Sequence, residues 1–463
     1  MTSGTSGTSG MPPGTAAGAM TAPAPARRSS DRGNEVLPAM VGTSVALLPI
    51  LVPAGPGNTA VADVAMALSL MLALLWVTRE NLPISFPYVV GVSLLVLGGA
   101  LASVVSSAPI TTALVLAQDC FLLLWAATLA LGRFDPAIIA AATVTWCRVA
   151  VVYSAVGILA YIIGFAPLSG VTAADGVRAS YTFDDPNLAG NYLVMSLFMM
   201  IACKRPRATS TRMIGYALVI TAMGFTGSIG AMLTLFVGAG AAISISRYRN
   251  HGVLAGVASL TASVVLSAAM LVFVTPHINF DAVRAEASAS IPLLRDSFGR
   301  SGSSTSERKT IVVEGAALFL LGHATGIGPA QTKATFEATP APYVKEAHND
   351  YLATLLERGL VGALGLLLLG AAVAARCWRL LTGRLPEAMA EIVPRFWLLV
   401  AIAPVMAAAA GFYEVLHFRH LWTWLGIVAA LVWAMQDQQQ RRHLSHEAPM
   451  PHRHDRPQPR EDA

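Results

Sequence analysis

The sequence predicts an all-α, polytopic integral membrane protein, a helical bundle with about 12 transmembrane helices. Hydrophobic residues make up 55% of the 463 residues and charged residues only 12%, whereas a soluble domain carries about 25% charged residues. The mean hydropathy is +0.60, and apolar runs recur at close to the ~20 residues that span a bilayer. Arginines cluster between these runs, so the net charge of +5 indicates membrane topology and not nucleic-acid binding.

Both ends of the chain have the composition of disordered tails, here expected to be cytoplasmic. Residues 1–35 are rich in Thr, Ser, Gly, Ala and Pro, and residues 436–463 are rich in Gln, His and Arg. Neither stretch can bury enough apolar surface to fold. Residues 36–435 are therefore expected to form one transmembrane domain.

The cysteines lie in or at the ends of apolar runs, which favours small buried hydrophobes over a disulfide framework or a zinc site. The sequence therefore predicts neither a metal nor a cofactor. These cysteines are Cys120, Cys147, Cys203 and Cys377.

The apolar segments follow one another along the whole domain. The segments 213–227 and 230–246 are short and separated by only a few residues, which predicts a tight helical hairpin. The expected spans are 37–53, 60–78, 87–105, 111–131, 137–165, 187–203, 213–227, 230–246, 252–275, 355–375, 396–413 and 420–435.

The distribution of Lys and Arg predicts that both termini are cytoplasmic. With the N-terminus inside, basic clusters such as Lys204–Arg205 fall on the cytoplasmic side. One large loop, about 276–353, then lies outside the cytoplasm between the ninth and tenth spans. Apart from this loop, the outer side keeps only Arg178 and Arg419 as basic residues.

His348 and Asn349 stand at the end of the large loop, just before the tenth span. Imidazole has an unperturbed pKa near neutrality, so His348 can accept and return a proton at the membrane surface. The alternative is an interfacial histidine followed by a helix N-cap, either Asn349 or Asp350.

Arg178 and Arg148 are cations in unexpected places. Arg178 breaks the positive-inside bias, and it either binds an anion or pairs with Asp175 or Asp184. Asp185 or Asn187 can cap the helix that follows. Arg148 lies in the middle of the fifth span, where a charge is usually paired or functional; it faces the bundle interior or snorkels to the surface.

A third arginine, Arg308, begins a predicted amphipathic helix at Arg308–Leu321 inside the large loop. It is either functional or part of a solvated helix start. Guanidinium groups match phosphate oxygens and keep their charge, so Arg178 and Arg308 can bind a pyrophosphate leaving group. A neutral His348 can deprotonate an acceptor hydroxyl. These groups together suit glycosyl transfer from a lipid-linked pyrophosphate without a metal ion.

Three motifs make the chain resemble the O-antigen ligase superfamily, which includes O-antigen ligases and polysaccharide polymerases, across residues 37–435. The most specific is His348-Asn349, nine residues, Gly359, two residues and Gly362. This spacing looks like the family signature at the end of the large outer loop.

The other two motifs contain the arginines. Arg308 precedes Gly326 and Gly328 by a short helix, which is similar to the family's arginine, helix and Gly-x-Gly turn. Arg178 followed by Pro186-Asn187 is similar to the family's Arg…Phe-x-x-Pro-Asn segment. The family's usual tryptophan four residues after the helix arginine is Val312 here.

The resemblance implies a multi-pass enzyme of the inner or plasma membrane that joins an undecaprenyl-pyrophosphate-linked glycan to an acceptor glycan or lipid. It implies that His348 is the base, that Arg178 and Arg308 bind the donor, and that Asn349 lies at the substrate. Many members have a Ser-Arg-Gly-Ala segment where this chain has Ile229 after Ser228. Arg419 is expected to replace that missing cation.

Ligase and polymerase share these motifs, so the acceptor stays open between a terminal glycan or lipid and another lipid-linked repeat. Two other classes also stay open. Twelve spans equally suit a solute transporter, for which Arg148 at membrane depth is the favouring feature. The replacement at Ile229 would fit a non-catalytic partner of other polysaccharide-assembly proteins, although Arg178, Arg308 and His348 argue against it.

Overall fold

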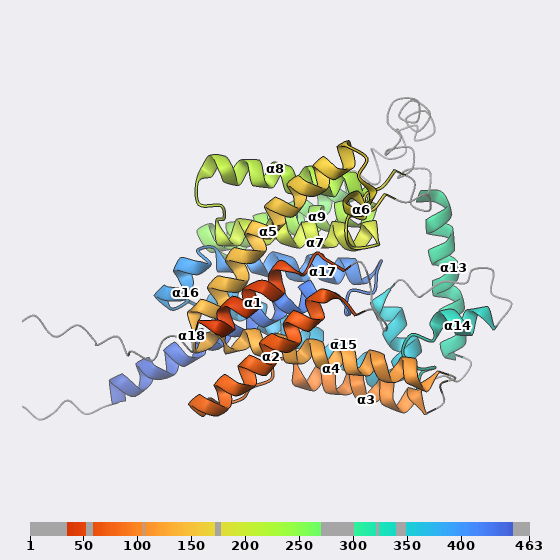
Figure 1. The fold of residues 1–463 in the computed structure, drawn as a ribbon, viewed down its shortest axis with the longest axis horizontal. Coiled ribbons are helices and arrows are strands. Elements are labelled where there is room, and N and C mark those ends of the chain that lie inside the picture. Colours follow the sequence, from red (N-terminus) through yellow and green to blue (C-terminus); the bar gives the residue numbers. More distant parts are fainter. Residues whose placement is uncertain are drawn as a thin grey trace, which may run out of the picture.

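The computed structural model shows a bundle of helices (Figure 1). It describes residues 35–51, 59–104, 106, 108–171, 177–269, 301–320, 324–338 and 349–447. All regular elements in these ranges are helices, without any strand. Six are long and apolar enough to cross a membrane, namely Val61–Glu80, Pro109–Arg133, Pro136–Ile162, Pro186–Cys203, Ile229–His251 and Asp350–Thr382.

Shorter apolar helices accompany these six, so the expected class of helical membrane protein is confirmed. The number of about 12 spans and the layout of the outer loops stay predictions. The shorter apolar helices are Val36–Ala46, Val89–Ser103, Val253–Leu266, Thr310–Leu320 and Phe396–Ala410.

The first five long elements build two neighbouring groups. Helix α1 packs on α2 and α5, whereas α3 packs on α4. Proline occupies the first turn of both α4 and α5, where its missing N–H leaves no intrahelical hydrogen bond unmade. These helices are α1 (Val36–Ala46), α2 (Val61–Glu80), α3 (Val89–Ser103), α4 (Pro109–Ala130) and α5 (Pro136–Ile162).

The middle of the chain surrounds α7. Helices α8 and α9 follow each other through Gly227 and Ser228, and both pack on α7. The expected tight hairpin is wrong, because α8 packs on α5 and α9 packs on α10 instead of on each other. Ser228 caps α9 by accepting a hydrogen bond from the Ala231 N–H. The elements are α6 (Ala166–Ser169), α7 (Pro186–Cys203), α8 (Thr209–Thr226), α9 (Ile229–His251) and α10 (Val253–Ala269).

The C-terminal part contains the longest helix, α15, which packs along α3. Helix α15 begins before the expected span at 355 and is interrupted at Gly359, where φ is 63° and ψ is −162°. Helix α18 continues beyond the expected span to Glu447. These elements are α13 (Ser301–Leu320), α14 (Thr332–Glu337), α15 (Asp350–Thr382), α16 (Glu387–Ile392), a 3-10 segment (Phe396–Ala401), α17 (Ile402–Ala410) and α18 (Arg419–Glu447).

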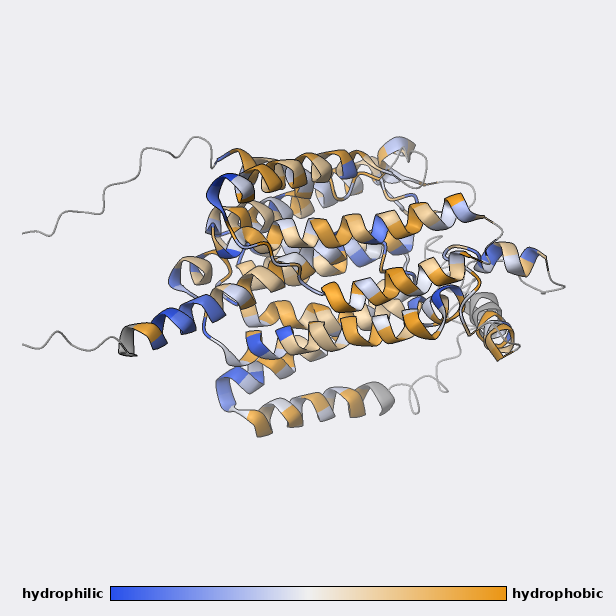
Figure 2. Ribbon diagram, turned by 90° about the horizontal axis from the view of Figure 1, so that it is seen from below, coloured by the Kyte–Doolittle hydropathy of each residue, from blue (hydrophilic) through white to orange (hydrophobic). Residues whose placement is uncertain are grey.

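Helices α13 and α14 lie together at one end of the bundle, where α13 runs across the ends of the long helices (Figure 1). Apolar residues run along the faces of the long helices, and hydrophilic residues gather at helix ends (Figure 2). This pattern suits a bilayer, since lipid replaces water around the apolar faces.

The core lies around α7 and residues 419–435 of α18, whose large side chains are almost all buried. Buried tryptophans have hydrogen-bond partners for their indole N–H groups. Trp125 donates to Thr423, and Trp146 donates to Ser196. These hydrogen bonds fix the orientation of neighbouring helices about their axes in an otherwise apolar interior.

Candidate functional site

The loop of residues 411–418, which joins α17 to α18, holds the start of α15. Asn349 Nδ2 donates to the Gly411 carbonyl oxygen at 3.2 Å. The buried Asp350 carboxylate accepts hydrogen bonds from the Val415 N–H at 2.7 Å and the Leu416 N–H at 3.2 Å. The 411–418 loop is therefore bound to the first two residues of α15.

Asn349, and not Asp350, is the N-cap of α15. Its Oδ1 accepts hydrogen bonds from the Tyr351 N–H at 2.9 Å and the Leu352 N–H at 3.2 Å. This contact satisfies backbone donors that the first turn of a helix leaves unpaired. His348 lies outside the described residues, one peptide bond before this cap.

Arg178 joins two loops at the ends of α7, α8 and α9. Its Nε donates to the Thr226 carbonyl oxygen at 2.9 Å, and its Nη2 donates to Asn187 Oδ1 at 3.1 Å. Ser228 Oγ donates to the same Asn187 oxygen at 2.9 Å. Because Asp185 caps α7, the Asn187 side chain accepts these two hydrogen bonds instead of capping the helix.

The segment that carries Arg178 is anchored on both sides. Tyr181 has a left-handed backbone, with φ of 53°, and its hydroxyl donates to the Ala222 carbonyl oxygen at 2.8 Å. Burial raises the pKa of Tyr181, so the phenol keeps the proton that it donates. Tyr161 donates to the Val177 carbonyl oxygen at 2.9 Å. These anchors fix the backbone on which Arg178 stands.

The Arg178 cluster reaches the 411–418 loop through the start of α9. A side chain at Gly230 would overlap the Tyr413 hydroxyl, so α9 and the loop touch there. Gly230 lies two residues after Ser228, which bonds Asn187. The structure thus brings Arg178, Asn187 and Asn349 to one end of the bundle.

The glycines of the motifs meet at the interruption of α15. Gly326 and Gly328 have φ of 91° and 105°, and the Gly328 N–H donates to the Glu357 carbonyl oxygen at 3.0 Å. A Cβ on Gly326 would lie 2.7 Å from the Gly359 nitrogen, and a Cβ on Gly359 would overlap the Ala324 carbonyl oxygen. Only glycine permits this contact between the turn and the broken helix.

Glu357 ties the turn to α14. Its carboxylate accepts hydrogen bonds from the Ala330 N–H at 2.8 Å, the Thr332 hydroxyl at 2.7 Å and the Thr332 N–H at 3.3 Å. Sequence reasoning gave Glu357 no role. An acid inside an expected membrane span was the signal that could have identified it.

Gly362 lies where α3 crosses α15, since a Cβ on Gly98 would come within 2.5 Å of the Gly362 nitrogen. Beside this crossing, Arg358 forms a buried ion pair with Asp119 of α4, and Arg358 Nη1 also donates to the Leu95 carbonyl oxygen at 3.3 Å. The ion pair was not predicted, although opposite charges in two apolar spans indicate such a pair.

Arg419 is buried, 6% exposed, and forms a two-pronged ion pair with Asp63. Both contacts, Nε to Oδ1 and Nη2 to Oδ2, are 2.6 Å long. Asp63 also accepts from the Ala60 N–H at the start of α2. Arg419 therefore joins α18 to α2, and its expected contact with the donor stays a prediction.

The remaining predicted residues lie apart from these contacts. Arg308 is part of α13, which begins at Ser301 and so earlier than expected; its side chain is outside the described part. Arg148 is exposed on α5. Ile229, in the place of the family's arginine, is 48% exposed at the start of α9.

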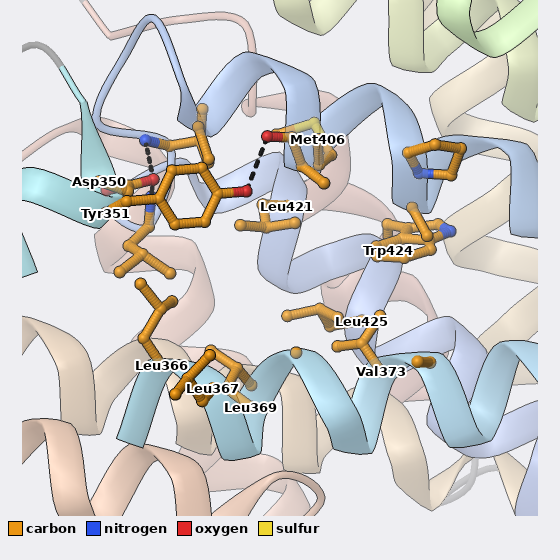
Figure 3. A pocket seen from close by; sticks show the side chains of 18 of the residues that line it. Asp350, Tyr351, Leu366, Leu367, Leu369, Val373, Met406, Leu421, Trp424 and Leu425 are labelled. Carbon is orange, nitrogen blue, oxygen red and sulfur yellow. Dashed lines mark hydrogen bonds between the residues drawn. The ribbon is translucent and has the colours of Figure 1, made fainter. Parts of the chain in front are cut away.

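Two cavities both contain residues of the 411–418 loop in their walls. One, of about 690 Å³, is enclosed by α15, α17 and α18 and is lined mostly by Leu, Ala and Met. Asp350 and Tyr351 stand at one end of it, and Tyr351 donates to the Ala407 carbonyl oxygen (Figure 3). The other, of about 530 Å³, contains charged and amide side chains from α4, α14, α15 and the loop. Among the residues that the structure describes, no group of three or more His, Cys, Asp and Glu is placed to hold a metal ion.

The long apolar helices define a helical, multi-pass membrane protein. Residues 214–367 match the family model described as O-antigen ligase. This part of the chain is thus similar to the family that the motifs predicted, and it contains two of the three motifs. No curated protein matches the chain.

Proposed function

We propose that the protein transfers a glycan from undecaprenyl pyrophosphate to a hydroxyl acceptor at the extracytoplasmic face, without a metal ion. The observation that carries this proposal is the apolar cavity that ends at Asp350–Tyr351, next to Asn349. A polyprenyl chain needs an apolar surface, and its pyrophosphate end needs a polar boundary. The cavity supplies the apolar surface. It ends at the start of α15, which the predicted base, His348, precedes in the sequence.

The reaction is a single displacement. His348 accepts the proton of the acceptor hydroxyl, whose oxygen forms a bond to the anomeric carbon of the donor sugar. The bond from that carbon to the pyrophosphate oxygen breaks, and undecaprenyl pyrophosphate leaves with the electron pair. Arg178 and Arg308 neutralise its developing charge, with Arg419 as a further cation of the same end. Both termini are cytoplasmic in this arrangement, which places the site outside.

The acceptor separates two versions of this function. A second lipid-linked repeat would make the protein a polymerase, and a terminal lipid or glycan would make it a ligase. Both versions use the same base and the same leaving group. Product length on denaturing gels distinguishes them, because a polymerase gives a ladder and a ligase gives one added block.

One observation favours a transporter as a second candidate. The interrupted α15 and the buried Asp119–Arg358 pair are features that transporters use at membrane depth. However, the carbonyl groups of Leu356 and Glu357 at the interruption accept hydrogen bonds from Ile327 and Gly328. Since the protein itself occupies these groups, glycosyl transfer remains the better supported function.

The experiment is an assay of transfer by purified protein with an undecaprenyl-pyrophosphate-linked repeat. We expect His348→Ala to lower the rate by about 10²–10⁴-fold, since it removes the general base. Arg178→Ala and Arg308→Ala should also abolish transfer. His251→Ala and Arg384→Ala are matched controls, because both residues are exposed and lie away from the site.

Unchanged transfer by the His348 variant would rule out the base assignment. Arg178 also has structural contacts, so Arg178→Lys serves as a folding control that keeps the charge. Uptake of a solute by vesicles with no glycan product would support the transporter instead.

A further inference from the structure

The polar cavity of about 530 Å³ is the feature that the proposed reaction does not yet use. Its volume falls within the roughly 300–1,000 Å³ of ligand sites. From this cavity we infer an acceptor-glycan subsite, which binds the sugar that carries the attacking hydroxyl. The inference rests on the proposed function, because only a transferase needs a second glycan beside the donor.

The side chains of the cavity match sugar hydroxyls, which both donate and accept hydrogen bonds. Gln118 offers an amide, Lys333 offers donors, and Glu414 offers acceptors. Leu114 and Val115 add an apolar patch for the carbon face of a sugar ring. This mixture differs from the nearly uniform apolar lining of the other cavity.

The charges of the cavity decide against the pyrophosphate as its occupant. Three carboxylates, from Glu337, Glu357 and Glu414, line the same space as the single ammonium of Lys333. Carboxylates in the wall of a cavity repel a bound polyanion. A neutral or amino sugar instead gains hydrogen bonds from them. The pyrophosphate therefore belongs with the arginines and the sugar with this cavity.

The 411–418 loop places the polar cavity beside the start of α15. Val415 and Leu416 of the loop line the apolar cavity. Glu414 and His417 line the polar one, with His417 Nε2 3.8 Å from Glu414 Oε2. Since Gly411 of the same loop accepts a hydrogen bond from Asn349, the loop connects the walls of both cavities to the start of α15.

Two residues that line the polar cavity are held in place by the contacts around them. Glu357 is bound to Ala330 and Thr332, and Gln118 stands next to Asp119, which pairs with Arg358. Side chains that are already held in place lose less conformational entropy when a ligand binds.

The test fills the cavity from an exposed position. Ala334 lines the cavity on α14, whereas Ala338, just after the same short helix, is also exposed and does not line it. We expect Ala334→Trp to raise the KM for a short acceptor oligosaccharide of the cell's own polysaccharide at least tenfold. The KM for the undecaprenyl-pyrophosphate-linked donor should not change, and Ala338→Trp should behave as the wild type.

A second pair of variants probes the chemistry instead of the volume. Glu414→Gln should raise the acceptor KM roughly tenfold, since it replaces a charge-assisted hydrogen bond to a sugar hydroxyl with a weaker neutral one. Glu391→Gln is the matched control, on the exposed surface of α16. Binding of the same oligosaccharide without donor, followed by saturation-transfer NMR, should weaken in Ala334→Trp and Glu414→Gln and persist in both controls.

The outcomes separate the two proposals. If the wild type transfers glycan but Ala334→Trp and Glu414→Gln keep its acceptor KM, the subsite is wrong and the function stands. An increase in the donor KM alone would assign the cavity to the donor and also overturn the inference. If no transfer occurs at all, the proposed function fails. In that case, NMR binding lost in Ala334→Trp would still support a glycan site, and unchanged binding would exclude it.

Discussion

The two cavities differ in chemistry although one short loop contributes residues to the walls of both. The apolar cavity takes α15 residues from both sides of the interruption at Gly359, whereas the polar cavity takes Glu357 from the segment before it. The segment before the break contributes to both cavities, since Tyr351 lines the apolar one and Glu357 the polar one. One interrupted helix thus lines two cavities of different chemistry.

The largest expected effect falls on the buried ion pair between Asp119 and Arg358. Asp119→Ala leaves the buried Arg358 charge without its carboxylate, which should cost about 3–5 kcal/mol of unfolding free energy. Denaturant unfolding in micelles measures this loss. The double variant Asp119→Leu with Arg358→Met should lose much less, and Glu80→Ala in the exposed Arg79–Glu80 pair should stay within about 0.5 kcal/mol. A single variant as stable as the wild type would contradict the structural role of the pair.

A second variant acts on the break itself. Gly359→Ala puts a Cβ onto a backbone with φ of 63° and into the Ala324 carbonyl oxygen. Such a backbone costs about 1–3 kcal/mol for a residue other than glycine. We expect lower thermal stability and a higher KM for both donor and acceptor.

Gly370→Ala in the same helix is the control, because nothing lies within 4 Å of a Cβ there. It should be neutral or slightly stabilising. Equal behaviour of the two alanine variants would show that the break needs no glycine.

The smallest expected effect is a change in the donor KM caused by a variant that fills the apolar cavity. Gly370 lines that cavity, so Gly370→Trp should raise the donor KM roughly tenfold, about 1.4 kcal/mol, and leave the acceptor KM unchanged. Gly224→Trp on α8 has equal open space for a side chain and should change neither. A rise in the acceptor KM would mean that the two cavities are not separate sites.

Local sequence patterns predicted the features that depend on neighbouring residues. Hydropathy predicted the helical membrane class, and short-range rules predicted caps at Asp185 and Asn349, although each with an alternative residue. The glycine spacings predicted a structural motif at Gly326 and Gly359, and the structure shows the two in contact.

Contacts between distant residues were not predictable in the same way. Asp119 and Arg358 come from helices 239 residues apart, and Arg419 meets Asp63 over 356 residues. A single sequence gives each charge but not its partner, because helix packing decides which faces meet. For the same reason the partner of Arg419 and the polar cavity were not predicted.

The contacts of the 411–418 loop have a thermodynamic consequence. Asp350 and Asn349 are hydrogen-bonded to it, and its residues 414–417 contribute to the walls of both cavities. A lipid that shifted this wall would change the affinity for the sugar, and by linkage the sugar would change the affinity for the lipid by the same factor. Eight residues of backbone would then couple the two binding steps.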